Sequence, residues 1–85
     1  MDIEDFIETI KTKKDFCHFV ELLAKDLEEN SAEWENPDLA SFLRAIVRYT
    51  HSLENNYIHR RIEEDAETPS WRRFADILMG ATVYE

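Results

Sequence analysis

The chain has 85 residues, a formal net charge of −9 and a hydrophobic content of 44%. This composition is typical of one small folded domain, residues 1–85, and excludes a disordered chain, because the apolar material suffices for a core. The negative charge argues against binding to nucleic acid or anionic lipid, since both repel a surface of that sign.

The N-terminus and the cysteine usage predict a cytoplasmic protein. The chain begins MDIED, which is acidic where a signal peptide needs positive charge. Cys17 is the single cysteine, so a disulfide framework within one chain is impossible. No apolar run approaches the roughly 18 residues of a membrane-spanning helix.

The first predicted helix covers residues 3–11. Ile3, Phe6, Ile7 and Ile10 recur at i, i+3, i+4 and i+7, which places them on one helical face. One glycine and two prolines in the whole chain leave few sharp turns, which favours helices throughout.

The second predicted helix covers residues 13–29. Thr12 and Asp15 have the spacing of a capping box, with Asp in place of the usual Glu or Gln. Its apolar stripe comprises Phe16, Phe19, Val20, Leu23 and Leu27, widened by Cys17, Leu22 and Ala24.

The third predicted helix covers residues 37–55. Asn36 is a suitable N-cap, and Pro37 suits the first helical position because its missing N–H is not needed there. Residues 56–67 are predicted to form a loop with at most one helical turn. The stripe of the third helix is the strongest in the chain and comprises Leu39, Phe42, Leu43, Ile46, Val47, Thr50 and Leu53.

The fourth predicted helix covers residues 69–83, with Thr68 as cap and Pro69 at its first position. Its apolar face includes Trp71, which we expect in the core. Gly80 either lets another helix approach closely or ends this one, and we favour the close approach. The four helices predict an all-α fold, a compact bundle of about four helices.

No catalytic or metal-binding pattern is present. Cys17, His18, His51 and His59 lack the spacing of a zinc site, and no phosphate-binding glycine loop occurs. Cys17 lies on an apolar stripe, where we expect an inert core thiol. The sequence therefore predicts a non-enzymatic protein with no metal and no cofactor.

Charged side chains supply the candidate partner-binding residues. Arg44 and Arg48 lie on one side of the third helix, and together with Arg60-Arg61 and Arg72-Arg73 they form either an anion-binding patch or internal ion pairs. Trp34 lies within an acidic stretch and is either a lid over the helix junction or an interface residue. The candidate site residues are Trp34, Glu28, Glu29, Glu33, Glu35, Asp38, Arg44 and Arg48.

Three segments resemble a known family. They are FxxFVELLAKD in the second helix, WENPDLASFLRA at the third, and PSWRRFADILMGATVYE at the end. This chain is similar to small, acidic, uncharacterised bacterial proteins with a "WEN" element and a C-terminal "WxxxAxxLxxAxxYE" element. The resemblance implies an all-α domain in which Trp34, Glu35, Asn36, Trp71, Tyr84 and Glu85 cap helices and lock their ends.

Size, charge and the lack of catalytic patterns predict a protein-binding module. One interpretation is an immunity- or antitoxin-like protein that masks a basic partner with its carboxylates. The alternative is a small regulatory or adaptor subunit that binds through an apolar groove or through the Arg44/Arg48 stripe.

Overall fold

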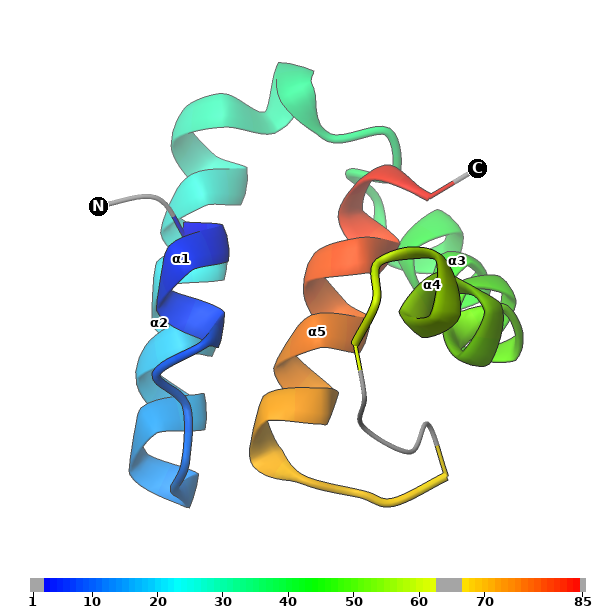
Figure 1. Cartoon of the computed structure of the whole chain (residues 1–85). Helices are drawn as coiled ribbons and strands as arrows, with labels where there is room; N and C mark the ends of the chain where they lie inside the picture. The colour runs from blue at the N-terminus through cyan, green and yellow to red at the C-terminus, as the bar shows by residue number, and fades with distance from the viewer. Residues whose placement is uncertain (1–2, 63–66, 85) are drawn as a thin grey trace.

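The computed structural model describes residues 3–62 and 67–84, which fold into five α-helices and one short 3-10 turn (Figure 1). The predicted all-α class is therefore confirmed. Helix α5 lies between α1 and α2 on one side and α3 and α4 on the other (Figure 1). The helices are α1 (Ile3–Ile7), α2 (Lys13–Asn30), η1 (Ser31–Glu33), α3 (Leu39–His51), α4 (Leu53–His59) and α5 (Trp71–Val83).

The junction between α1 and α2 confirms the predicted capping box but shortens the first helix. The Thr12 hydroxyl accepts a hydrogen bond from Asp15 N, while Asp15 Oδ2 accepts from Thr12 N and from Lys11 N. These backbone donors hold the pKa of Asp15 below its usual value, the bond from Lys11 most of all. Because Lys11 and Thr12 belong to this cap, the first helix ends at Ile7 and does not extend to residue 11.

The predicted caps of the third and fourth helices are wrong by two residues. Asp38 caps α3 by accepting from Ser41 N, and Ser70 caps α5 by accepting from Arg73 N. Each proline therefore lies two residues before its helix and not within it. Asn36 is engaged elsewhere, and the Thr68 carbonyl instead accepts from the Arg73 guanidinium.

The predicted helix over residues 37–55 is two helices, and the loop predicted from residue 56 begins later. Ser52 interrupts the helix between α3 and α4, and its hydroxyl bonds the Tyr49 carbonyl. Helix α4 continues to His59, since Tyr57 is buried against α5. Arg61 then adopts a left-handed φ of 58°, and Ile62 N reaches back to Tyr57 O at 2.8 Å, a Schellman-type ending.

Two apolar clusters lie on opposite sides of α5. The first joins α1 and α2 to α5 and contains Ile7, Ile10, Phe19, Leu23 and Ala75. The second joins α3 and α4 to α5 and contains Tyr49, Leu53 and Tyr57. Both halves of the core therefore pack against helix α5.

Gly80 lets α3 pack directly on α5, as predicted. A Cβ atom built on Gly80 would lie 2.2 Å from Tyr49 Cζ and 2.4 Å from Tyr49 Cε1. The Tyr49 ring is buried and packs edge-on against Tyr84 at 5.4 Å, so it has little room to move aside. Helix α5 also continues past Gly80 to Val83, which excludes the alternative that the glycine ends it.

Asn36 fastens the segment before α3 to the end of α5. Its Nδ2 donates to Ala81 O at 3.0 Å and to Tyr84 O at 2.8 Å, and its backbone N donates to Thr82 O at 3.0 Å. The last carbonyls of a helix have no partner within it, so these bonds cap the C-terminus of α5. Asn36 is itself buried, and the cap is therefore shielded from water.

Several side chains predicted to be in the core are exposed. Trp71 is 37% and Phe74 is 41% exposed, and they form an aromatic cluster with Phe16 at the start of α2. Cys17 is exposed as well, so the prediction of a core thiol is wrong. The reason is that α5 presents small residues such as Ala75 and Gly80 to its neighbours and turns its N-terminal aromatic side chains outward.

We predict that Gly80→Ala destabilises the protein by about 1–3 kcal/mol, the usual cost of overpacking. This outweighs the roughly 1 kcal/mol that alanine gains over glycine in a helix. Thermal and urea unfolding measure the difference. Tyr49→Leu removes the ring, so Gly80→Ala should cost less in that background; an equal cost in both backgrounds would contradict the assigned contact.

We predict that Asn36→Ala lowers the free energy of unfolding by about 1–3 kcal/mol, because it leaves buried carbonyl groups without donors. Asn36→Asp should be at least as harmful at neutral pH, since carboxylate oxygens would face the Ala81 and Tyr84 carbonyl oxygens. Urea unfolding of both variants tests this, and an Asp variant as stable as wild type would exclude the proposed cap.

Candidate protein-binding surface

An apolar row on α3 faces solvent. Leu39 is 72%, Leu43 is 52% and Val47 is 56% exposed, although the sequence predicts that this stripe faces the core. Ala45 and Tyr49 face α5 in its place, because their side of α3 fits against Gly80. The three exposed residues are four apart, so they follow one another along about 12 Å of helix. We call Leu39, Leu43 and Val47 the α3 row.

A groove borders the α3 row where α2 and α3 meet the segment that connects them. It has a volume of about 250 Å³, and its wall is almost entirely apolar. We call it the α2–α3 groove; its lining residues are Val20, Leu23, Ala24, Leu27, Trp34, Pro37, Asp38, Leu39 and Phe42. Leu39 belongs to both features, so the groove and the row form one continuous apolar surface.

Trp34 is held in the wall of this groove. Its Nε1 donates to Asp26 Oδ2 at 2.8 Å, and its ring lies 5.8 Å from that of Phe42 at an angle of 34°. The ring is half-buried and packs against the core cluster formed by α1, α2 and α5. Trp34 therefore covers the junction of α2 and α3, as one of the two alternatives predicts, and part of its side chain remains exposed to solvent.

The predicted acidic site residues lie close to this groove along the chain. Glu28 and Glu29 are exposed near the end of α2, and Glu33 and Glu35 are exposed on either side of Trp34. Asp38 lines the groove and also caps α3. The sequence also has a second acidic cluster, which comprises Glu63, Glu64, Asp65 and Glu67, and residues 63–65 of it lie outside the described residues.

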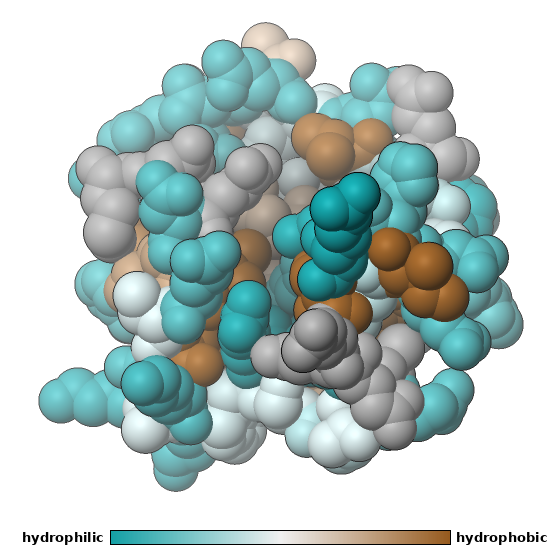
Figure 2. Space-filling model, in the orientation of Figure 1, coloured by the Kyte–Doolittle hydropathy of each residue, from teal (hydrophilic) through white to brown (hydrophobic). Residues whose placement is uncertain are grey.

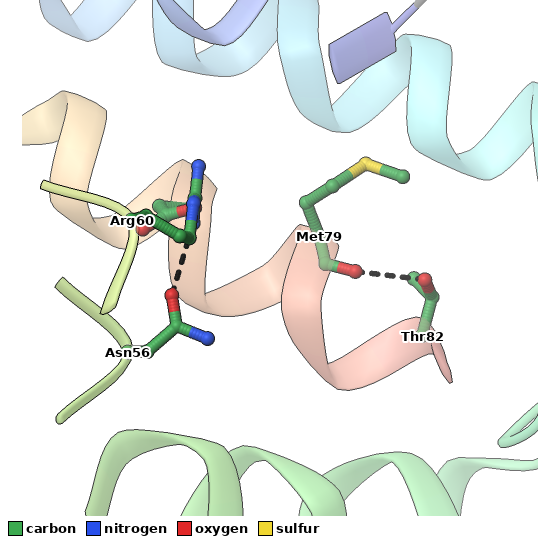
Figure 3. Close-up of polar contacts among 5 residues, drawn as sticks. Asn56, Arg60, Met79 and Thr82 are labelled. Carbon is green, nitrogen blue, oxygen red and sulfur yellow. Dashed lines mark hydrogen bonds and ion pairs between the residues drawn. The ribbon is translucent and has the colours of Figure 1, made fainter. Parts of the chain in front are cut away.

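The predicted basic residues do not form one patch. Arg44 and Arg48 are exposed on α3, but Arg73 is buried and stacks over the Tyr57 ring at 4.9 Å. Arg60 Nη1 lies 3.6 Å from Asp76 Oδ1 and donates to Asn56 Oδ1 at 3.1 Å, the latter bond drawn in Figure 3. Internal ion pairing, the second of the alternatives, therefore describes Arg60, whereas Arg73 is held by the Tyr57 ring and the Thr68 carbonyl.

A second hollow of about 320 Å³ lies between α1, α4 and α5 and is more polar than the groove. Figure 2 shows this side of the molecule, with hydrophilic side chains around it. Asp76 and Arg60 line the hollow together with Tyr57, and burial raises the pKa of the Tyr57 hydroxyl well above its usual value. Arg60 pairs with Asp76 across the α4–α5 junction and also donates to Asn56, the bond drawn in Figure 3, and these contacts stabilise the junction.

Within the described ranges, no group of three or more His, Cys, Asp or Glu side chains could hold a metal ion. None of the helices over residues 3–62 and 67–84 is long and apolar enough to cross a membrane. His18, His51 and His59 are exposed, and His18 packs edge-on against Phe6.

Comparison with known proteins places the chain in a family without naming an activity. The chain belongs to a family of unknown function, DUF7660, whose profile matches residues 12–85. No curated protein and no solved structure matched the chain. The match includes both Asn36 and Tyr84, the two residues that join the segment before α3 to the end of α5.

The α3 row was missed from sequence, although a signal for it exists. Helix α3 is apolar over a wide arc, because Ala45 and Tyr49 add a second apolar side to the predicted stripe. A helix with two apolar sides and one neighbour must expose one of them. The sequence pattern alone does not show which apolar side of α3 is exposed, because that depends on how each side packs against α5.

We predict that the Asp38 side chain stabilises α3 at neutral pH and that this stabilisation is lost in strong acid. Hydrogen bonds from the Ser41 hydroxyl, at 2.6 Å, and from its N–H hold the Asp38 pKa below 3.8. A group with a lowered native pKa adds stability above its unfolded pKa, and that stability is lost as the pH falls through the native value. Wild type should therefore be more stable than Asp38→Asn at pH 7 and equal to it in strong acid.

Urea unfolding across this pH range is the measurement. Glu28→Gln is the matched control, because Glu28 is an exposed carboxylate that caps no helix. If the difference in unfolding free energy between wild type and Asp38→Asn is the same in strong acid as at pH 7, a charged cap at Asp38 is excluded.

Proposed function

We propose that this protein is a non-enzymatic binding module that acts by docking a protein partner on the α3 row and the α2–α3 groove. The observation that carries the proposal is the exposure of Leu39, Leu43 and Val47 on one side of α3. A small soluble domain rarely leaves a contiguous apolar surface open to water unless a partner covers it. Among the sequence-based interpretations, this favours the adaptor that binds through an apolar groove.

The groove is also built like a binding site. Trp34 and Phe42 are large aromatic groups held in place by packing, and Trp34 is further fixed by its bond to Asp26. Rigid aromatic side chains lose little entropy when a partner covers them, which is why they dominate binding energy at many interfaces. Asn36 and the Asp38 cap hold the segment between these two rings.

A second candidate is the immunity- or antitoxin-like role, in which carboxylates mask a basic surface. The exposed side chains of Glu28, Glu29, Glu33 and Glu35 support it, together with the net charge of −9. We place both roles in the bacterial cytoplasm, following the family resemblance. The two roles differ in their response to salt, because screening weakens charge pairs and leaves apolar contacts intact.

The test is affinity capture from native lysate with quantitative mass spectrometry, comparing wild type with two double variants. Leu39→Gln/Leu43→Gln removes apolar surface at exposed helical positions and keeps the net charge. Arg44→Gln/Arg48→Gln is the control on the same helix. We expect a partner that survives a high-salt wash, is lost with the leucine variant and is retained with the arginine variant.

Two other outcomes of the capture experiment would support a different binding role. A partner that is released by salt and binds all three proteins equally supports charge masking. A partner lost only with Arg44→Gln/Arg48→Gln supports the basic stripe as the binding surface. Circular dichroism and thermal unfolding should show that both double variants fold like wild type, since all four residues are exposed.

A further inference from the structure

The α2–α3 groove has an acidic edge along α2. Ala24 lines the groove, and the exposed Glu21 and Glu28 lie three residues before it and four residues after it. Residues at these spacings are neighbours on a helix surface, so both carboxylates lie beside Ala24. The segment that follows α2 adds exposed Glu33 and Glu35 on either side of Trp34.

The α3 side of the surface is different. No acidic residue occurs in α3, and Arg44 follows Leu43 directly, so it points about 100° away from that residue around the helix. The acidic edge therefore runs along α2 and the connecting segment only. An occupant with positive charge on that edge would gain from both the local carboxylates and the net charge of −9.

The shape of the surface fits a helix. Leu39, Leu43 and Val47 repeat every four residues along α3, and residues of α2 line the groove that adjoins this row at Leu39. A helix that lies beside two others presents apolar anchors at i, i+3, i+4 and i+7 to such a surface. The volume of about 250 Å³ suits anchor side chains and is below the roughly 300–1,000 Å³ of most small-molecule pockets.

We propose that the occupant of the α2–α3 groove is a basic amphipathic helix of a partner protein. Its apolar side packs on Trp34, Phe42 and the α3 row, and its Lys or Arg residues meet Glu21, Glu28 and Glu35. This inference rests on the proposed binding function and adds the chemistry of the partner. A second copy of the chain is the less favoured occupant, because each copy carries the same charge of −9.

The test uses three synthetic peptides of about four helical turns, roughly 14 residues. The first has Leu at i, i+3, i+4 and i+7 and Lys elsewhere. The second has the same composition with Leu spread evenly around the helix. The third repeats the first with Glu in place of Lys. Isothermal titration calorimetry at low and high salt measures their affinity for the full chain.

We expect the amphipathic Leu–Lys peptide to bind at least about tenfold more tightly than either other peptide, a difference of about 1.4 kcal/mol. Leu39→Gln/Leu43→Gln leaves the net charge of the protein unchanged and should weaken binding of this peptide about tenfold. Glu28→Lys/Glu35→Lys should weaken it as well, whereas Arg44→Glu, on the far side of the α3 row, should not.

Four results would overturn the inference. Equal binding of the evenly spread peptide means that charge alone is recognised. Equal binding of the Leu–Glu peptide means that the occupant is not basic. A dimer in sedimentation equilibrium that Leu39→Gln/Leu43→Gln dissociates means that a second copy covers the surface. If none of the peptides binds while lysate capture still depends on Leu39 and Leu43, the partner is of another kind and the proposed function stands.

Discussion

The contact of the Tyr49 ring with Gly80 decides how the two halves of this protein meet. A side chain of any size on Gly80 would overlap the ring, so α3 and α5 come together only because that position is bare. Tyr84 packs edge-on against the same ring. Once the Tyr49 side of α3 faces α5, the opposite side, with Leu39, Leu43 and Val47, must face solvent. The candidate binding surface is thus a consequence of this one packing contact.

Asn36 provides the second constraint, and it links distant parts of the chain. Its bonds to Ala81, Thr82 and Tyr84 attach the segment after α2 to the end of α5. Because Asn36 is fixed there, Trp34 and Pro37 on either side of it take their places in the groove wall. One buried amide therefore caps a helix and positions the candidate site.

A small domain has limited means to cover every apolar side chain. Here α5 has two sides, and α1 with α2 cover one while α3 with α4 cover the other. Helix α3 carries more apolar surface than α5 can cover, and the excess remains exposed beside a groove with an acidic edge. Apolar contacts supply affinity and complementary charge supplies selectivity and fast association. This face combines exposed apolar side chains with acidic ones, and this combination distinguishes it from the polar surface of an ordinary solvent-exposed helix.

The sequence by itself determined the helical class, the four main apolar segments and the Thr12–Asp15 capping box, and it favoured the close helix approach at Gly80 without deciding it. These are local properties, set by the spacing of apolar residues and by what a single residue permits. Tertiary structure decided the rest. It moved the caps from Asn36 and Thr68 to Asp38 and Ser70, because Asn36 and the Thr68 carbonyl bond to residues of α5. It also decided which side of α3 was buried, because the less apolar side with Ala45 and Tyr49 fits against Gly80, and the more apolar Leu39, Leu43 and Val47 stay exposed. That choice depends on contacts between residues far apart in the chain, which no local pattern records.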